Sequence, residues 1–326
     1  MFNPQKGMIL LLLVGLMILS LFIGRYPLSV GDIIAILTFQ HPSEIKSHLF
    51  FQVRLPRILM ALLCGAYLAQ AGSIYQTAFK NPLVSPDLLG VSSGATIGAI
   101  IGIVLLQTSP FSVQVMTFSF GLLAVLLAIM LANSFRIQED IALVLAGIVI
   151  SAILNSIIMM LKTIADPHRE LALIEFWLMG SLQRSSIEQL GMMVLGVIPL
   201  LVLFLMRYQV KLLALGYEQA RTLGLYYKHV KVTVILCATL LASITIMHVG
   251  VVAWVGLISP HISRLLFGDD YEKNFGSITI IGGIILLAAD NMARAMFSVE
   301  IPISIITALM GATFLLIILW SRKRYD

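Results

Sequence analysis

Long apolar runs alternate with short polar stretches along almost the whole chain. A membrane-spanning helix needs roughly 20 apolar residues, and fewer where it is broken or re-entrant. On that basis the pattern predicts ten segments, with approximate bounds 8–24, 55–75, 91–106, 111–132, 141–161, 190–206, two within 232–267, 275–292 and 301–320. We therefore expect an all-α integral membrane protein that forms a single transmembrane domain over residues 1–326.

Three stretches need separate interpretation. Val232–Phe267 is too long for one spanning helix, and Gly250 and Pro260 predict a split into two segments, the second of them short. The polar stretch Lys162–Gln189 contains the motif WLMG, which indicates a helix at the membrane interface. The apolar start of the chain is longer than the core of a signal peptide and is followed by no small-residue cleavage site, so we expect an uncleaved first span.

Composition supports this class of protein. The chain is 59% apolar and only 11% charged, whereas soluble domains carry about 25% charged residues. The net charge of +5 comes from basic residues that cluster on one set of loops, which indicates membrane topology and not nucleic-acid binding. Cys64 and Cys237 both lie inside apolar runs, so we expect small packing residues, with no disulfide and no metal site.

The charge distribution also predicts orientation. Arg207–Lys231, here named the basic loop, has five basic residues and one acid, and Lys- and Arg-rich loops stay on the cytoplasmic side. An even number of spans then places both termini in the cytoplasm. Proline-interrupted stretches at 81–90 and 256–268 follow spans 2 and 7 and occupy similar places in the two halves. This echo predicts an inverted internal repeat, as in many transporters.

The basic loop is itself patterned. LLALGYEQARTLGL predicts two short helical stretches, each ended by a glycine, Gly216 and Gly224, at turns that need a positive φ. Apolar residues at helical spacing on a basic cytoplasmic loop are typical of a surface that docks on another protein. The alternative is a short amphipathic helix that rests on the lipid surface.

The chain has no G-x-x-x-x-G-K-[ST] motif, so we expect no ATPase activity of the phosphate-loop type. Asp290 is the one acid near the centre or end of a predicted span. An intramembrane carboxylate is a candidate functional group, but pairing with Arg294 at i+4 explains it equally well. An ion-driven secondary transporter would depend on Asp290 alone, and an intramembrane enzyme would need a catalytic constellation that the sequence does not offer.

Five motifs, in a fixed order from about residue 54 to the end, resemble the permease subunits of ABC importers for ferric siderophores, haem and cobalamin. They are RLPRILMALLCGAYLAQAG, NPLVSPDLLGVSSGA, LALGYEQARTLGL, VGLISPHISRLLFGDD and EIPISIITALMGATF. The resemblance implies a ten-helix, type II importer subunit in a bacterial or archaeal cytoplasmic membrane. It also implies a second permease copy or paralogue, two cytoplasmic ATPases that bind ATP and Mg²⁺, and an external substrate-binding protein.

Under this resemblance the chain binds no cofactor and is not an enzyme, since the ATPase is a separate subunit. The expected cargo is a ferric siderophore, with haem, cobalamin or an oxyanion such as molybdate as alternatives. The residues implied to contact the ATPase are Leu215, Gly216, Glu218, Ala220, Arg221, Leu223 and Gly224. Those implied to dock the binding protein are Arg54, Arg57 and Arg294, for which ordinary interfacial anchoring is the alternative.

The resemblance also implies an inner gate and a translocation path between two permease subunits. The gate would include Asn81, Leu83, Asp140 and Ile141, although Pro82 could simply stop a helix at this point. Spans 5 and 10 would line the path, with Ser151 and Asn155 as polar groups on span 5. These two side chains could equally form a hydrogen-bonded seam between helices.

Overall fold

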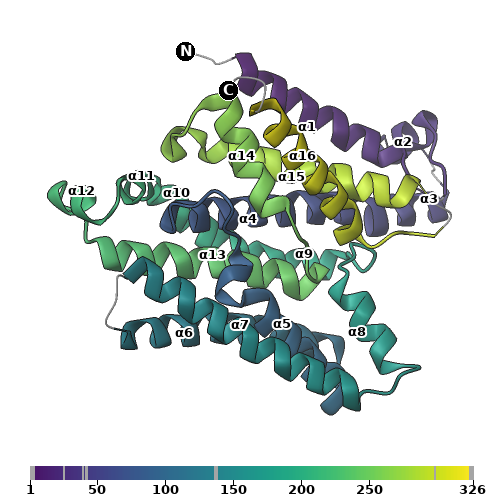
Figure 1. Ribbon diagram of the computed structural model, residues 1–326. Helices are drawn as coiled ribbons and strands as arrows, with labels where there is room; N and C mark the ends of the chain where they lie inside the picture. Colours follow the sequence, from purple (N-terminus) through teal and green to yellow (C-terminus); the bar gives the residue numbers. More distant parts are fainter. Residues whose placement is uncertain are drawn as a thin grey trace.

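The computed structural model describes residues 4–24, 26–38, 40, 43–135, 139–296 and 299–322, and every regular element among them is helical (Figure 1). The helices are α1 Pro4–Phe22, α2 Val30–Leu37, α3 Glu44–His48, η1 Leu49–Arg54, α4 Leu55–Ala78, η2 Pro86–Leu89, α5 Val91–Ile100, η3 Ile101–Leu105, α6 Pro110–Ser134, α7 Glu139–Ile164, α8 Glu170–Leu178, α9 Ile187–Met193, η4 Val194–Gly196, α10 Val197–Leu205, α11 Arg207–Leu215, α12 Tyr217–Thr222, α13 Tyr227–Val249, α14 Val255–Phe267, α15 Tyr271–Ala295 and α16 Ile303–Arg322.

Within these described residues, seven helices are long and apolar enough to cross a membrane. Three shorter apolar helices, Val91–Leu105, Val255–Phe267 and Ile303–Ile318, complete a set that matches the ten predicted segments. The all-α membrane fold is therefore confirmed. The inverted repeat stays a prediction.

Helix α4 forms the centre of the bundle, and α13, α14 and α15 pack around it (Figure 1). Small residues allow this close approach. A Cβ atom added to Gly65 would lie 2.2 Å from the carbonyl oxygen of Gly282 in α15, and one added to Gly72 would lie 1.8 Å from that of Gly256 in α14. Backbone therefore meets backbone on two sides of α4, and no side chain fits between the helices.

Two peripheral layers flank this core. Helices α5, α6 and α7 lie on one side, whereas α1 and α16 lie on the other (Figure 1). Both layers expose large apolar side chains, such as Ile148 and Ile153 of α7 and Leu309 and Leu316 of α16. Because water does not favour such surfaces, these helices face lipid or another subunit.

The first polar stretch differs from the prediction. Span 2 does not begin near Leu55, because helical structure runs without interruption from Glu44 through the π-helical segment η1 into α4. The side chain of Phe50 explains the early start, since it is buried in a separate apolar cluster with Leu28, Ile33 and Ile36 of the α2 region. The sequence pattern missed this cluster because charged and polar residues separate its members.

The predicted split of Val232–Phe267 is confirmed. Helix α13 ends at Val249, Gly250 takes a positive φ of 79°, and α14 contains Pro260. The WLMG prediction also identified a real helix, because Trp177 and Leu178 end α8. Span 6 is broken into α9, a 3-10 turn (η4) and α10.

Candidate functional site

The basic loop folds as two helices at one end of the bundle. Helix α11 ends at Leu215 and is followed by Gly216, which has a φ of 97°. Helix α12 ends at Thr222, and Gly224 beyond it has a φ of 83°. Side chains other than glycine rarely adopt these conformations. The predicted pair of short helices separated by glycine turns is therefore confirmed.

These two helices and the turn between α12 and α13 present apolar groups on an otherwise basic surface. Leu223 is 59% exposed and Tyr226 is 80% exposed, and Leu215 and Tyr217 are also exposed. Glu218, Arg221 and Gly224 share this exposure, whereas Ala220 is fully buried beneath α12. Exposed apolar side chains next to charged ones are typical of a surface that another protein covers.

The basic loop lies close to two other elements. Lys211 Nζ lies 3.0 Å from Asp270 Oδ2 and 3.2 Å from Glu272 Oε2, both at the start of α15. A Cβ atom on Gly216 would lie 1.9 Å from Lys80 Nζ, just beyond the end of α4. The ion pairs of Lys211 therefore link α11 to the start of α15, whereas the exposed and flexible end of Lys80 only lies close to the turn at Gly216.

Electrostatics reinforce the link to α15. Hydrogen bonds to Asp270 and Glu272 raise the pKa of Lys211 above its ordinary value. Partial burial alone would raise the pKa of Asp270, but hydrogen bonds from Lys211 and from the backbone N–H of Lys273 hold that pKa below its usual range. Both members of the pair are consequently charged around neutral pH.

At the opposite end of the bundle, Arg57 is buried in an ionic network. Its Nε donates to Asp290 Oδ1 at 2.9 Å and its Nη2 to the same oxygen at 2.7 Å. Arg57 Nη2 also contacts Glu300, which lies in the connection between α15 and α16. Arg57 is only 8% exposed, so the two carboxylates compensate a charge that is largely shielded from water.

Arg294 and Arg54 complete this arginine cluster. Arg294 Nε lies 3.0 Å from Asp290 Oδ2, and its Nη2 donates to Ser20 Oγ at 2.7 Å. Arg54, 3% exposed, donates to the carbonyl oxygens of Leu21 and Tyr26. The predicted i+4 pairing of Asp290 with Arg294 is confirmed.

The three arginines predicted to dock a binding protein all lie at this end of the bundle, where Arg57 and Arg294 share Asp290 and Arg54 donates to backbone carbonyls. The structure does not present them as free surface charges, because Arg54 and Arg57 are buried and Arg57 and Arg294 both pair with Asp290. The pattern of helix ends could not show this pairing, since Arg57 and Asp290 are far apart in the sequence. Their contact with a binding protein stays a prediction.

The predicted gate residues lie near the end of α4 and the start of α7. Asn81 Oδ1 accepts a hydrogen bond from the backbone N–H of Leu83 at 3.0 Å, directly after α4 ends, so the helix-stop interpretation is confirmed. Leu83 and Ile141 are exposed. Asp140 begins α7 with Glu139, and its side chain lies outside the described residues.

The polar groups of α7 contact the neighbouring elements α5 and η2. Asn155 Oδ1 accepts a hydrogen bond from Ser93 Oγ at 3.0 Å, and Ser151 Oγ lies close to Gly90. The seam interpretation is thus confirmed for Asn155. A role for these residues in lining a path stays a prediction.

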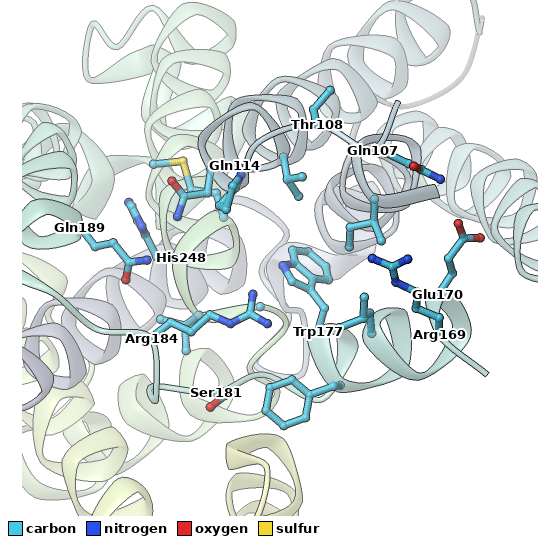
Figure 2. A pocket seen from close by; sticks show the side chains of 18 residues that line it. Gln107, Thr108, Gln114, Arg169, Glu170, Trp177, Ser181, Arg184, Gln189 and His248 are labelled. Atoms are coloured by element: carbon cyan, nitrogen blue, oxygen red, sulfur yellow. The ribbon is translucent and has the colours of Figure 1, made fainter. Parts of the chain in front are cut away.

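A cavity of about 370 Å³ lies where the starts of α6 and α8 meet the end of α13 (Figure 2). Its lining is largely apolar, and we name it the polar cavity after the hydrogen-bonding groups on part of its wall. Its polar lining includes Gln114, Arg184, Gln189 and His248, with Trp177 from α8. Sequence reasoning missed this site, because its residues are scattered over some 150 positions. The signal that could have indicated it is the isolated Gln114 and His248 near the ends of two apolar runs.

Comparison with known proteins gives a consistent family. Residues 11–321 match the model described as the FecCD transport family. The chain is 35% identical over 322 residues to the molybdate import system permease protein MolB of Haemophilus influenzae, covering 96% of this chain and 94% of that protein. It is 34% identical over 292 residues to a probable iron chelatin transport system permease protein of Helicobacter pylori, covering 87% of each.

A hemin transport system permease protein, HmuU of Yersinia pestis, is 31% identical, with coverage of 98% of this chain and 96% of that protein. A solved structure described as an inward-facing metal-chelate type ABC transporter superposes with a TM-score of 0.87 at 32% identity, covering 98% of this chain and all of the other. Match, identity and coverage agree over nearly the full length: this chain belongs to the FecCD transport family of ABC importer permeases.

Proposed function

We propose that this permease carries a ferric chelate of the siderophore type across the cytoplasmic membrane, using ATP hydrolysed by a separate subunit. The family assignment supports import through an ABC system. The relatives named for iron chelatin and hemin, and the metal-chelate description of the similar structure, support the cargo class. Such chelates are too polar to cross the hydrocarbon core of a bilayer, so passage needs a protein-lined path.

The exposed apolar surface of α11, α12 and the turn after them is the observation that carries the ATPase part of this proposal. Leu215, Leu223 and Tyr226 would seat on the ATPase subunit, with Glu218 and Arg221 at the rim. Closure of two ATPases on ATP would push this surface toward the bundle. The ion pairs of Lys211 with Asp270 and Glu272 would then transmit the push to α15.

A second permease copy would complete the path. Helices α7 and α16 lie on opposite sides of the bundle, so one chain cannot enclose a channel between them (Figure 1). Both helices expose apolar side chains that a partner subunit can cover. Association of two copies would bring α7 of one near α16 of the other, with Asn155 and Ser151 close to the axis.

The arginine cluster would receive the external binding protein. Its described members are three guanidinium groups and two carboxylates, which leaves one positive charge. Glu300 is more exposed than Asp290 and lies outside the helices. An acidic side chain of a partner could therefore displace Glu300 from Arg57. Docking would thereby act on the connection that leads into α16.

Molybdate is the second candidate cargo, because the relative at 35% identity over almost the full length is named for it. Uptake by cells that express the complete system separates the two cargoes. We expect accumulation of ⁵⁵Fe supplied as a hydroxamate or catecholate chelate, and no competition by molybdate. Accumulation of ⁹⁹Mo that iron chelates do not reduce would reverse the assignment.

The ATPase interface is tested with Leu223→Asp in the same system. The change should lower recovery of the ATPase with the tagged permease by at least roughly tenfold, as expected when an apolar interface residue is replaced by a charge. Val30→Asp is the matched control, because Val30 is equally exposed but lies in the first turn of α2, at the other end of the bundle. Equal recovery with both variants would contradict the proposed seat.

Orientation is tested by thiol labelling. Single cysteines replace Tyr217 or Arg169 in a background that lacks Cys64 and Cys237. We expect an impermeant reagent to label position 169 in intact cells and position 217 only after the membrane is opened. Labelling of position 217 from outside would overturn the arrangement.

A further inference from the structure

The polar cavity lies apart from every site discussed above. It is a partly open cavity bordered by η3, α6, α8, α9 and the last turn of α13, and it shares no residue with the arginine cluster. Figure 1 shows α8 and α12 at opposite ends of the bundle, so the cavity is also remote from the basic loop. Its volume of about 370 Å³ exceeds what a single small ion fills.

Hydrogen-bond donors dominate its polar wall. Arg169, Arg184, Gln114, Gln189 and the indole N–H of Trp177 can all donate, and Figure 2 shows the two guanidinium groups directed toward the region around Trp177. Neither arginine forms an ion pair with another described residue. Glu170 is the one carboxylate among the lining residues, so the wall has a net positive charge.

His248 adds an independent indication of a ligand. Its side chain is 8% exposed and lines the cavity, yet neither ring nitrogen hydrogen-bonds to any described residue. A neutral imidazole has one N–H to donate, and a protonated one has two. Buried polar groups of this kind normally have a partner, so a group with acceptor oxygens in the cavity would satisfy it.

The helices that border the cavity reinforce its preference for an anion. Pro110 and Val113 come from the first turn of α6, and Glu170 and Leu173 come from the first turn of α8. The N-terminus of a helix carries a partial positive charge, which favours a nearby anion. The backbone N–H groups of Val113, Glu170 and Leu173 already donate to backbone carbonyls, so these termini contribute charge and not free donors. Two such termini meet the cavity beside the two arginines.

We propose that this cavity binds an oxyanion group of the phosphate class, with Arg184 and His248 as its central contacts and Arg169, Gln114 and Gln189 around them. Ile103, Leu173 and Phe176 provide an apolar part of the lining, which can receive the organic portion of a phosphate ester. The bound group is therefore either the headgroup of a phospholipid or free phosphate. The proposal does not depend on which cargo the permease carries.

The test uses the full-length permease assembled with its ATPase. Calorimetric titration with inorganic phosphate, at constant ionic strength in lipid-free detergent, measures the free anion. Native mass spectrometry after reconstitution with phosphatidylglycerol measures the retained lipid. Saturable binding of phosphate identifies the free anion as ligand, and retained lipid without phosphate binding identifies the headgroup.

Three variants test whether ligand affinity changes in the direction that an anion site predicts. Arg184→Gln removes a charged donor and should weaken whichever ligand binds by roughly tenfold. Glu170→Gln removes the repelling carboxylate and should tighten binding severalfold, while its side chain can still accept from the N–H of Asp166. Lys162→Gln is the control, because Lys162 pairs with Glu175 at 2.7 Å and does not line the cavity, so binding should not change.

Arg184 is exposed and forms no contact that folding requires, so its replacement should leave thermal unfolding unchanged. Binding of neither ligand would overturn the proposal. Equal affinity of the native protein and the Arg184→Gln variant for both ligands would also overturn it. In that case the retained lipid would be bound elsewhere on the bundle.

Discussion

At one end of the bundle, Arg57 and Arg294 share the carboxylate of Asp290, Arg54 donates to backbone carbonyls, and all three are largely hidden from solvent. At the other end, the basic residues of α11 and α12 stand among exposed apolar side chains. The first arrangement ties α4, α15 and the connection to α16 together from within. The second leaves charge and apolar surface available to another protein. Basic residues at helix ends thus serve opposite purposes in one chain.

The difference depends on carboxylates from distant parts of the chain. Asp290 is completely buried and lies within reach of both Arg57 and Arg294. In the basic loop, Glu218 is exposed, and only Lys211 reaches the carboxylates at the start of α15. A buried charge needs its partner, while an exposed charge contributes little to folding.

The largest effect should follow from breaking the buried network. Asp290→Asn leaves Arg57 and Arg294 without their shared counter-charge in a site closed to water, and loss of one member of such a pair costs about 3–5 kcal/mol. We expect a much lower thermal unfolding temperature in detergent, measured by intrinsic fluorescence.

The matched control is Asp32→Asn at the same end of the bundle. Asp32 lies 2.6 Å from Lys46, but both side chains are partly exposed. Hydrogen bonds from Lys46 and Ser29 lower the pKa of Asp32 to about 2, so the pair is intact at neutral pH, yet water screens it. We expect little change in unfolding temperature. A similar loss in both variants would show that burial does not distinguish these ion pairs.

The next effect concerns the turn that separates α11 from α12. Gly216→Ala forces a Cβ into a backbone region that is almost exclusive to glycine, at a cost of about 1–3 kcal/mol, and the flexible end of Lys80 must move aside. Cargo uptake and recovery of the ATPase should both fall sharply, while the amount of inserted permease stays normal.

Alanine variants of two other glycines serve as comparisons for Gly216→Ala. Gly224 also has a positive φ but nothing lies within 4 Å of an added Cβ, so Gly224→Ala should give an intermediate loss. Gly276 has the same open surroundings and an ordinary helical φ, so Gly276→Ala should leave uptake unchanged. Unchanged uptake in Gly216→Ala would show that the conformation of this turn is not needed to couple the ATPase to transport.

The glycine turns show what sequence could predict. Local patterns foretold Gly216, Gly224 and the break at Gly250, because a turn depends on a few neighbouring residues. The same holds for the ten apolar segments, which depend on the composition of each stretch.

Distant pairings were beyond such patterns. The neutralisation of Arg57 by Asp290, the hydrogen bond from Ser93 to Asn155 and the polar cavity around His248 all depend on which helices become neighbours. A one-dimensional pattern records that a residue is charged or polar. It does not record the distance to its partner, and this distance decides whether an arginine binds another protein or stabilises its own chain.

A smaller effect should come from Glu300, whose partner Arg57 is paired within the chain and is also predicted to dock a binding protein. An external binding protein with an acidic side chain would compete with Glu300 for Arg57. Glu300→Gln should then raise the affinity of the binding protein for the permease by a few fold, because the carboxylate that repels the acidic side chain is removed. Affinity is measured by biolayer interferometry at several salt concentrations, and raised salt should weaken the native complex. Weaker binding by Glu300→Gln would place the docking surface elsewhere.

The smallest effect should come from Lys211, the ionic link at the basic-loop end. Lys211 is partly exposed, so Lys211→Gln should lower the unfolding temperature by less than about 2 °C, far less than Asp290→Asn. The pH dependence follows from the two shifted pKa values. Asp270 has a lowered pKa, so its share of the stabilisation is complete above the ordinary carboxyl pKa of about 4 and is lost as the pH falls through the lowered value.

Lys211 has a raised pKa, so its share is complete below the ordinary lysine pKa of about 10 and is lost only as the pH rises through the raised value. The difference in unfolding temperature between the native protein and Lys211→Gln should therefore be constant from about pH 5 to pH 9 and shrink below about pH 4. A difference that changes near pH 6 or 7 would mean that a histidine, and not Asp270, governs the link between the basic loop and α15.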